Sequence, residues 1–467
     1  MTTAMGAALR RIQLGNALSA FGNGFTVPFL FVYVARVRDL GASTAGMVLA
    51  AFAVAALAVL PFTGRVIDRR GPLPVALVGA VASAFGSMGM GLASDEASVI
   101  AAVALLGAGI AVIQPALATM IVWCSTTTTR SRAFATQFFL NNLGLGVGGL
   151  IGGLLVDPSA PSSFVRLFAI ESVMFLVLGA AVATVRLPKP PKLDPASAVA
   201  ERAGGGWRAM LRNRAMVQLC VLGFVMFFAC YGQFESGLSA FAVEVTRISP
   251  AMLGAALAAN TMAIVLAQFI VLRLVEGRRR SRVIALTGLV WTVAWLVAGA
   301  SGLVPGSQAV ATGAIISAYA LFGLGEAMLS PTVAPLVADL APPTLVGQYN
   351  SGFALVKQLA LAVGPAVGGL MAGSGLYVAY IAMLVGCSLG ISALALRLGR
   401  RLTARQDNPL RAVPATPVPA QRREAVDSVT AAGGATGGAP PRAGRAGAPP
   451  GGGGGGGAAA TASGPAR

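Results

Sequence analysis

The chain has 467 residues, of which 56% are hydrophobic and 11% charged, and its mean hydropathy is +0.77. A soluble domain carries about a quarter charged residues, so this composition excludes a water-covered globular protein. The formal charge of +18 would suit a nucleic-acid partner. The arginines, however, lie at the ends of apolar segments rather than in one stripe, so we exclude nucleic-acid binding.

Twelve apolar segments follow one another along the chain, each long enough to cross a bilayer as a helix. The predicted spans cover residues 12–36, 44–67, 74–93, 98–123, 132–156, 163–186, 215–241, 250–275, 282–303, 308–335, 347–371 and 376–399. The first span lacks a small-residue cleavage site, so we expect it to be retained. The sequence predicts an all-α integral membrane protein whose twelve transmembrane helices form two pseudo-symmetric six-helix bundles.

Two pairs of stretches repeat at one constant offset. Residues 107–115 read GAGIAVIQP and residues 323–331 read GLGEAMLSP, which is an offset of 216 positions. The same offset aligns GGLIGG at 148–153 with GPAVGG at 364–369. A duplicated hydrophobic chain of this length is typical of a membrane transporter built from two similar halves.

The chain divides into four predicted parts. These are an N-terminal bundle at 1–186, a central loop at 187–214, a C-terminal bundle at 215–402, and a disordered tail rich in Gly, Pro and Ala at 403–467.

Basic residues concentrate on one alternating set of loops, which includes the central loop. The opposite set holds only Arg36, Arg38, Arg166 and Arg247. The positive-inside rule therefore predicts a multi-pass protein of the cell membrane with both termini, the central loop and the tail in the cytoplasm.

The loop after the second span reads GRVIDRRG at 64–71. It resembles the G-x-x-x-D-R-x-G signature of the major facilitator superfamily, although Pro72 and Leu73 replace the two basic residues that usually follow. The resemblance covers residues from about 12 to 400 and implies alternating access between two six-helix halves. It also implies that Asp68 faces the positive N-terminal end of a helix such as span 11 and holds the cytoplasmic side shut. An ordinary basic turn is the alternative. The expected gating residues are Gly64, Asp68, Arg69, Gly71 and, in the second half, Glu276.

The fifth span resembles the G-x-x-x-G-P-x-x-G-G motif of the superfamily's exporters, with Gly149 in place of proline. This resemblance, to the twelve-helix drug:proton antiporters, favours efflux over uptake. The arginine that exporters often carry early in span 4 is missing, and Ala104 lies near its place. Glycines four residues apart let helices pack closely and bend. The expected packing positions are Gly144, Gly148, Gly152, Gly153, Gly364, Pro365, Gly368 and Gly369.

Three ionisable residues stand out inside the predicted spans, where a charge is costly unless it has a function or a partner. Glu235 in span 7 is the first candidate for proton coupling, with a solvated place at the outer mouth as the alternative. Glu326 in span 10 and Lys357 in span 11 each lie about 15 Å deep, so we expect an ion pair with a coupling or a static structural role. Six further acids are expected in loops or at span ends, in contact with solvent: Asp39, Asp95, Glu96, Asp157, Glu244 and Asp339.

Polar groups inside spans are the candidates for a substrate cavity. They are Asn23, Tyr33, Gln114, Gln137, Asn141, Tyr231 and Gln233. We expect proton-coupled secondary transport by which amphipathic drug-like or natural-product compounds leave the cell, a function that would give antibiotic resistance. A sugar or other metabolite transporter of the same fold is the alternative.

We expect no enzyme, cofactor or metal site, because the chain has no histidine and no Gly-rich phosphate-binding loop ending in Lys-Ser/Thr. The expected partners are a small-molecule substrate, protons and the lipid bilayer, with the chain acting as a monomer.

Overall fold

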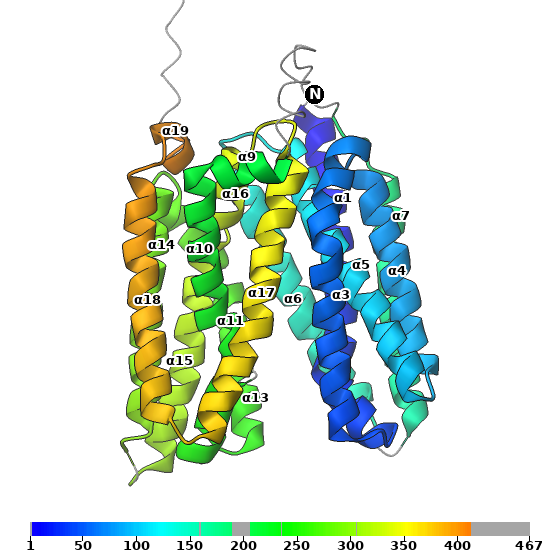
Figure 1. Cartoon of the computed structure of the whole chain (residues 1–467), viewed down its shortest axis with the longest axis vertical. Helices are drawn as coiled ribbons and strands as arrows, with labels where there is room; N and C mark the ends of the chain where they lie inside the picture. The colour runs from blue at the N-terminus through cyan, green and yellow to red at the C-terminus, as the bar shows by residue number, and fades with distance from the viewer. Residues whose placement is uncertain (1, 158–159, 189–205, 235, 305, 412–467) are drawn as a thin grey trace, which may run out of the picture. The chain divides into compact units, whose positions relative to one another are not determined.

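The computed structural model describes residues 2–157, 160–188, 206–234, 236–304 and 306–411 (Figure 1). Their regular structure is helical, with no strand among them. Twelve helices in these ranges are long and apolar enough to cross a membrane, which confirms the predicted fold class and number of spans. Three parts of the predictions lie outside the described residues. They are residues 189–205 of the predicted central loop, Glu235, and the predicted tail beyond residue 411.

The first bundle begins with α1 (Thr2–Thr26), which continues through a short irregular segment to Val37. This segment consists of η1 (Val27–Phe29), α2 (Leu30–Val32) and η2 (Tyr33–Val37). The other helices are α3 (Gly41–Arg70), α4 (Pro72–Leu92), α5 (Glu96–Trp123), α6 (Arg130–Leu155) and α7 (Pro161–Ala183). α1 packs against α6 and α7, and α4 packs against α5 and α7.

The second bundle follows α9 (Gly206–Arg212), a short helix within the predicted central loop. Its seventh span is α10 (Arg214–Ala229) with α11 (Tyr231–Phe234), followed by α12 (Gly237–Ala240) and η3 (Phe241–Val245). The remaining helices are α13 (Pro250–Val275), α14 (Arg280–Ser301), α15 (Gln308–Leu329), α16 (Val333–Leu340), α17 (Val346–Gly373), α18 (Tyr377–Gly399) and α19 (Ala404–Asp407). α14 packs against α15 and α18, and α13 against α15.

Local sequence explains where several of these helices change direction. Pro28 has no amide hydrogen, and α1 gives way to a 3-10 turn beside it. Pro331 separates α15 from α16 in the same way. Gly71 has φ +89°, a conformation that residues with a Cβ rarely adopt, and it joins α3 to α4 with no further loop residue.

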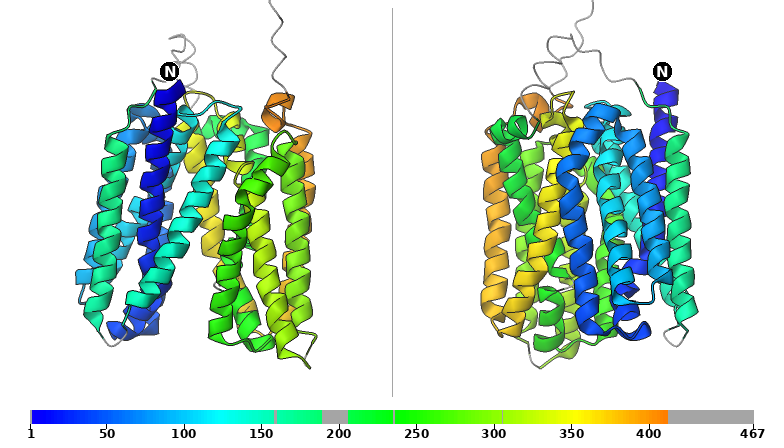
Figure 2. Two further views of the ribbon diagram at one scale, coloured as in Figure 1. Left: turned by 180° about the vertical axis from the view of Figure 1, so that it is seen from behind. Right: turned by 45° about the vertical axis from the view of Figure 1, so that its right-hand side comes forward.

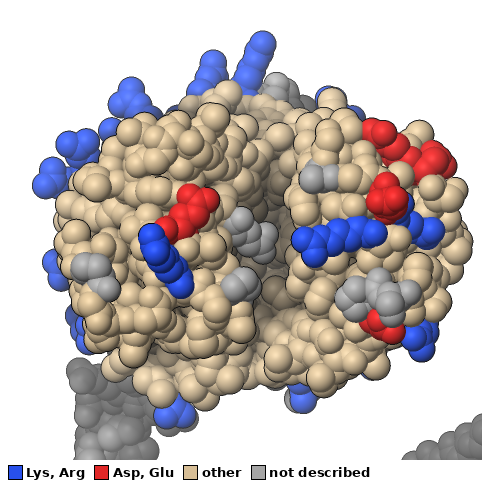
Figure 3. All heavy atoms as spheres, turned by 90° about the horizontal axis from the view of Figure 1, so that it is seen from below, with Lys and Arg blue, Asp and Glu red and all other residues tan. Residues whose placement is uncertain are grey.

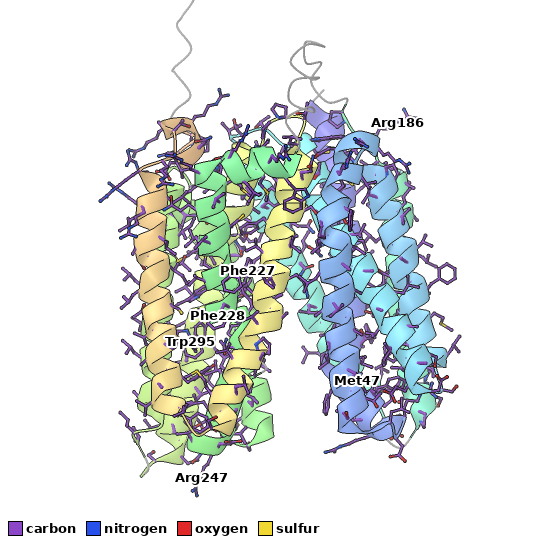
Figure 4. The ribbon with its side chains drawn as sticks, in the orientation of Figure 1. Met47, Arg186, Phe227, Phe228, Arg247 and Trp295 are labelled. Carbon is purple, nitrogen blue, oxygen red and sulfur yellow. The ribbon has the colours of Figure 1, made fainter. Side chains whose placement is uncertain are left out.

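Each bundle has its own aromatic core. Tyr33, Phe164 and Phe168 are fully buried in the first bundle, and the ring centroids of Tyr33 and Phe168 lie 4.9 Å apart. In the second bundle Trp295, labelled in Figure 4, is fully buried, and its ring centroid lies 4.9 Å from that of Phe322. Burial of these large rings contributes strongly to the stability of each half.

The two bundles meet mainly near one end of the helices. We call this the arginine-rich end, because Arg69, Arg130, Arg186 and Arg280 lie there, and we call the opposite end, with Arg247, the open end; Figure 4 labels Arg186 and Arg247. α17 contacts α3 and α5, and α6 contacts α13. Seen from behind, the halves separate toward the open end (Figure 2), and from below a hollow lies between them (Figure 3).

Two specific contacts between the bundles illustrate the closed end. Asn350 Nδ2 of α17 donates to Thr119 Oγ1 of α5 at 3.2 Å. The rings of Phe139 in α6 and Phe269 in α13 lie 4.9 Å apart. The described unit, which lies within Met1–Val413, is therefore in a conformation that is closed at one end and open at the other.

The tail was predicted to be disordered from residue 403, and this start is too early. Thr403 caps α19, and the buried Asp407 accepts hydrogen bonds from the Ser281 amide at 2.8 Å and the Ser281 hydroxyl at 3.0 Å. The reason is that Asp407 caps the first turn of α14, a role that composition alone does not indicate.

Candidate transport site and closed end

A buried carboxylate lies near the middle of the tenth span. Glu326 is 3% exposed, and its Oε1 accepts a hydrogen bond of 2.8 Å from Asn260 Nδ2 of α13. The Tyr231 hydroxyl of α11 also hydrogen-bonds to this carboxylate. Three helices thus converge on one acidic group, as burial of a carboxylate requires.

Lys357 lies across from this group on α17 and is exposed. Its ammonium lies 5.2 Å from the centroid of the Phe227 ring, which is a cation–π distance. Phe227 in turn contacts the rings of Tyr231 at 5.3 Å and Phe353 at 6.1 Å. Figure 4 shows Phe227 on α10 beside α17.

The predicted Glu326–Lys357 ion pair is wrong as a direct contact. The described residues form three ion pairs within 4.0 Å, and this is not one of them. Glu326 is instead bound by Asn260 and Tyr231, while Lys357 lies on Phe227. The two groups still interact electrostatically. Span and depth place both residues in the same region, but the direction of a side chain on its helix decides the contact.

Two predicted cavity residues belong to the bundle cores. Tyr33 is fully buried, and its hydroxyl donates to the Met90 carbonyl at 2.9 Å. Gln233 is also fully buried; its Nε2 donates to the Gly364 carbonyl at 3.2 Å, and its Oε1 accepts from Tyr380 at 3.0 Å. These polar groups are satisfied within their own bundles and do not line the hollow.

The other predicted cavity residues have different surroundings. Gln114 is exposed in the middle of α5. Asn141 Oδ1 accepts from Asn16 Nδ2 at 3.2 Å, a bond between α6 and α1. Asn23 Oδ1 and Gln137 Oε1 are buried and have no hydrogen-bond partner among the described residues. Glu235 lies outside the described residues.

Asp68 is held by the first turn of α17 at the arginine-rich end. The Gly347 amide donates to its Oδ1 at 2.7 Å, and the Gln348 amide donates to its Oδ2 at 3.0 Å. The Gln348 side chain donates to Oδ2 as well, at 3.0 Å. These donors are the free amides of a helix N-terminus, where a negative charge is favourable. The contact links α3 of one bundle to α17 of the other.

The neighbouring signature positions have distinct surroundings. Gly64 lies against α17 so closely that a Cβ would come 2.5 Å from the Gln348 Cα. Arg69 is exposed and lines a small cavity with Arg65, Trp207 and Arg208 at this end. Glu276, the residue aligned with Asp68, is exposed, and among the described residues its carboxylate forms none of the ion pairs or hydrogen bonds. In this conformation no contact among the described residues supports the gating role expected for Glu276.

Asp339 is a second link between the bundles, and the expectation that solvent surrounds it is wrong. Its side chain is 7% exposed and lies between two arginines. Arg130 from α6 of the first bundle binds Oδ1, and Arg280 from α14 of the second binds Oδ2 at 2.6 Å. Arg280 also donates to the Gln406 carbonyl of α19 at 3.0 Å. Sequence reasoning missed this site because Asp339 lies at a span end, where acids are usually hydrated.

The predicted glycine positions do not all lie at close contacts. A Cβ at Gly144 would be 2.4 Å from the Ala17 carbonyl oxygen, and one at Gly148 would be 2.1 Å from that of Phe21. At Gly152 the nearest atom would be the Phe25 Cα at 3.1 Å. α1 and α6 are therefore in backbone contact along this stripe. Gly153 lies beside it, with the nearest atom 3.8 Å away.

The copy in α17 approaches the broken seventh span. A Cβ at Gly364 would lie 2.8 Å from the Gly232 Cα, and one at Gly368 would lie 2.6 Å from Gln233 Oε1. Gly369 has no heavy atom within 4 Å. Pro365 lies inside α17.

Sequence reasoning missed two further polar residues. Glu171 in α7 is 1% exposed, and its Oε2 lies 2.6 Å from the Ser87 hydroxyl of α4. It is the one acidic residue in the sixth predicted span, so the depth argument used for Glu326 could have found it. Asn260, which binds Glu326, carries no charge, so the argument from a charge inside a predicted span does not apply to it.

The architecture and the site define a class of protein. Two similar six-helix bundles enclose a hollow that opens at one end, and ionisable groups lie beside it at the middle of the spans. These are the features of a secondary membrane transporter that works by alternating access.

The family follows from comparison with known sequences. The model of the Major Facilitator Superfamily matches residues 12–249 and 238–439, so the chain belongs to this family. It is 25% identical over 379 residues to the uncharacterized MFS-type transporter YdeE of Escherichia coli (strain K12), covering 79% of this chain and 90% of that one.

Other relatives differ in what they carry. Multidrug resistance protein 2 of Bacillus subtilis (strain 168) is 29% identical over 175 residues, which cover 36% of this chain and 43% of that protein. The structure of the proton:xylose symporter XylE superposes with a TM-score of 0.64 at 14% identity, covering 85% of this chain and 95% of that chain. This likeness concerns the fold alone.

Proposed function

We propose that this transporter moves amphipathic small molecules out of the cell and couples their movement to protons. The observation that carries the proposal is Glu326, a buried carboxylate at mid-span beside the hollow, bound by Asn260 and Tyr231. A carboxylate in such surroundings can take up and release a proton as access to it changes. Tyr231 is only half-buried, so its hydroxyl would connect Glu326 to the hollow.

Export and orientation have separate support. The arginine-rich end would face the cytoplasm by the positive-inside rule, so the hollow would open to the outside. Asp68 and Asp339 would hold the cytoplasmic end shut in this conformation. The partial likeness to a multidrug resistance protein and the exporter-like glycine motif both favour efflux over uptake. The termini and central loop would then be cytoplasmic, and the chain would act as a monomer.

The coupling can be tested in liposomes that enclose a pH-sensitive dye. Purified protein would be exposed to a proton gradient, and a panel of amphipathic anions, cations and neutral compounds would be added in turn. We expect substrate-triggered proton flux in the wild type and its loss in Glu326→Gln, which keeps the shape of the side chain but cannot carry a proton. Glu276→Gln is the matched control, because Glu276 is exposed and lies outside the hollow.

Two results would separate the possible outcomes. Undiminished flux in Glu326→Gln would exclude Glu326 as the coupling site and direct the same substitution to Glu235. Flux triggered by sugars but by none of the amphipathic compounds would instead support the metabolite carrier, the alternative that the shared fold of a xylose symporter keeps open.

A further inference from the structure

The charge at the middle of α17 indicates what kind of molecule the hollow binds. Lys357 lies eleven residues after Val346 and sixteen before Gly373, the two ends of this helix. At 1.5 Å per residue its Cα is about 16 Å along the helix, near the centre of a bilayer. A lysine at this depth is costly unless it faces water or a partner, and such positions usually serve function.

The side chain of Lys357 faces the hollow. Asn350 lies two helical turns earlier on the same face of α17 and bonds to Thr119 of the other bundle, near the arginine-rich end. Further along, α17 diverges from α3 of the first bundle (Figure 1), and Lys357 is exposed rather than covered by that helix. Its ammonium is therefore accessible from the open end.

Within the described part of the chain, no carboxylate neutralises this ammonium by direct contact. The ion pairs there join Arg130 and Arg280 to Asp339, and Arg279 to Asp407. Glu326 acts on Lys357 only at longer range, because its carboxylate is bound by Asn260 and Tyr231. Among the described residues, Lys357 thus presents a positive charge that no carboxylate contacts directly.

The wall next to this charge is aromatic. Phe227 lies under the ammonium, and Phe353 and Tyr231 are its ring neighbours. All three rings are only half-buried in the structure. Ring faces of this kind bind flat or bulky apolar groups, whereas the ammonium repels a second cation and attracts an anion.

We propose that the substrate of this transporter is an amphipathic organic anion, whose carboxylate or sulfonate binds Lys357 and whose apolar body lies on Phe227 and Phe353. The inference rests on the proposed transport function, and it adds the sign of the substrate's charge. Glu326 acts on Lys357 at longer range, so its protonation state would change how tightly the anion is bound.

The test is equilibrium binding of two probes with nearly the same size and shape but opposite charge. Tetraphenylborate and tetraphenylphosphonium would be titrated into the purified full-length protein by calorimetry, with protein-free detergent as the blank. We expect the wild type to bind the borate at least tenfold more tightly than the phosphonium. In Lys357→Gln this preference should disappear through weaker borate binding, and Lys357→Arg should keep it.

Several results would overturn the inference. They are equal affinity of the wild type for the two probes, a preference for the phosphonium, or unchanged borate binding in a folded Lys357→Gln variant. A purely structural role for Lys357 would lower the affinity for both probes alike. The affinities of the wild type for the two probes can be compared without any variant, so a misfolded variant does not prevent the test. No proton gradient is involved, so failure here leaves the proton-flux experiment on Glu326 as an independent test of coupling.

Discussion

The carboxylate of Asp339 in the second bundle binds the guanidinium of Arg130 in the first, and both side chains are almost completely buried. Arg280 occupies the other oxygen of the same carboxylate. Two buried arginines from different halves of the molecule therefore share one acidic group, and the cluster keeps a formal charge of +1. Removing it leaves two uncompensated charges, which is far more costly than losing a surface ion pair.

Asp339→Ala should therefore destabilise the protein strongly, by about 3–5 kcal/mol. The measurement is thermal unfolding of the purified protein in detergent. Glu276→Ala removes an exposed carboxylate at the same end and should change stability by less than about 0.5 kcal/mol. Similar unfolding temperatures for the two variants would mean that the Asp339 bridge contributes little to stability.

The contact of Asp68 with α17 should control the balance between the two end states of transport. Asp68→Asn removes the charge and places an amide donor against one of the two main-chain amides, that of Gly347 or that of Gln348. We expect opening of the arginine-rich end to become about tenfold more favourable, because hydrogen bonds to a charged group are strong. Faster hydrogen exchange at the first turn of α17 would report it, with Glu276→Gln as control. Wild-type exchange rates in Asp68→Asn would contradict the gating role.

The two glycine stripes provide a matched pair of substitutions. Gly148→Ala would place a Cβ 2.1 Å from the Phe21 carbonyl oxygen, so α1 and α6 must move apart. Gly369→Ala adds the same methyl group where no heavy atom lies within 4 Å. We expect Gly148→Ala to lower the unfolding temperature clearly and Gly369→Ala to leave it unchanged or raise it slightly, since alanine favours a helix. Equal effects would argue against backbone contact between α1 and α6.

Asp95, at the open end, should make the stability of the protein depend on pH. It caps α5, and the amide of Ser98, followed by the Ser98 hydroxyl, holds the pKa of Asp95 below its ordinary value of 3.8. Its contribution to stability is therefore present above that value and is lost as the pH falls through the lower pKa of the folded state. Asp95→Asn keeps a capping group but cannot titrate, so thermal unfolding followed down to acidic pH should lose this component. An identical pH profile in the variant would show that Asp95 does not contribute to it.

Much of the fold follows from composition and spacing. Apolar segments of bilayer length predict the spans, because lipid leaves a helix few alternatives. The repeat and the Gly64–Gly71 signature suggest two related halves and a helix N-terminus as the partner of Asp68. Each of these inferences depends on the position of a residue along the chain, which the sequence gives directly.

The details of the candidate site depend on the direction in which each side chain points from its helix. Tyr33 and Gln233 lie at a depth suitable for a cavity, yet their side chains point into the bundle cores. Glu326 and Lys357 lie at matching depth without touching, because rotation about each helix axis directs them to different neighbours. The role of Asp339 depends on two helices from different bundles, each of which contributes an arginine to its carboxylate. Helix rotation and packing between halves are set by many weak contacts, and no short motif encodes them.

The Asp68 contact is made to the main chain of α17, and this has a consequence for sequence variation. Any residue except proline supplies an amide hydrogen, so positions 347 and 348 could change without removing the two amide donors to the carboxylate. Steric space limits position 347, where a Cβ would lie 2.5 Å from Ile67, but the chemistry of recognition does not. The acceptor side of this contact, Asp68, is therefore recognisable from a sequence motif. The donor side depends on the main chain at the start of α17 and leaves almost no trace in the amino-acid sequence.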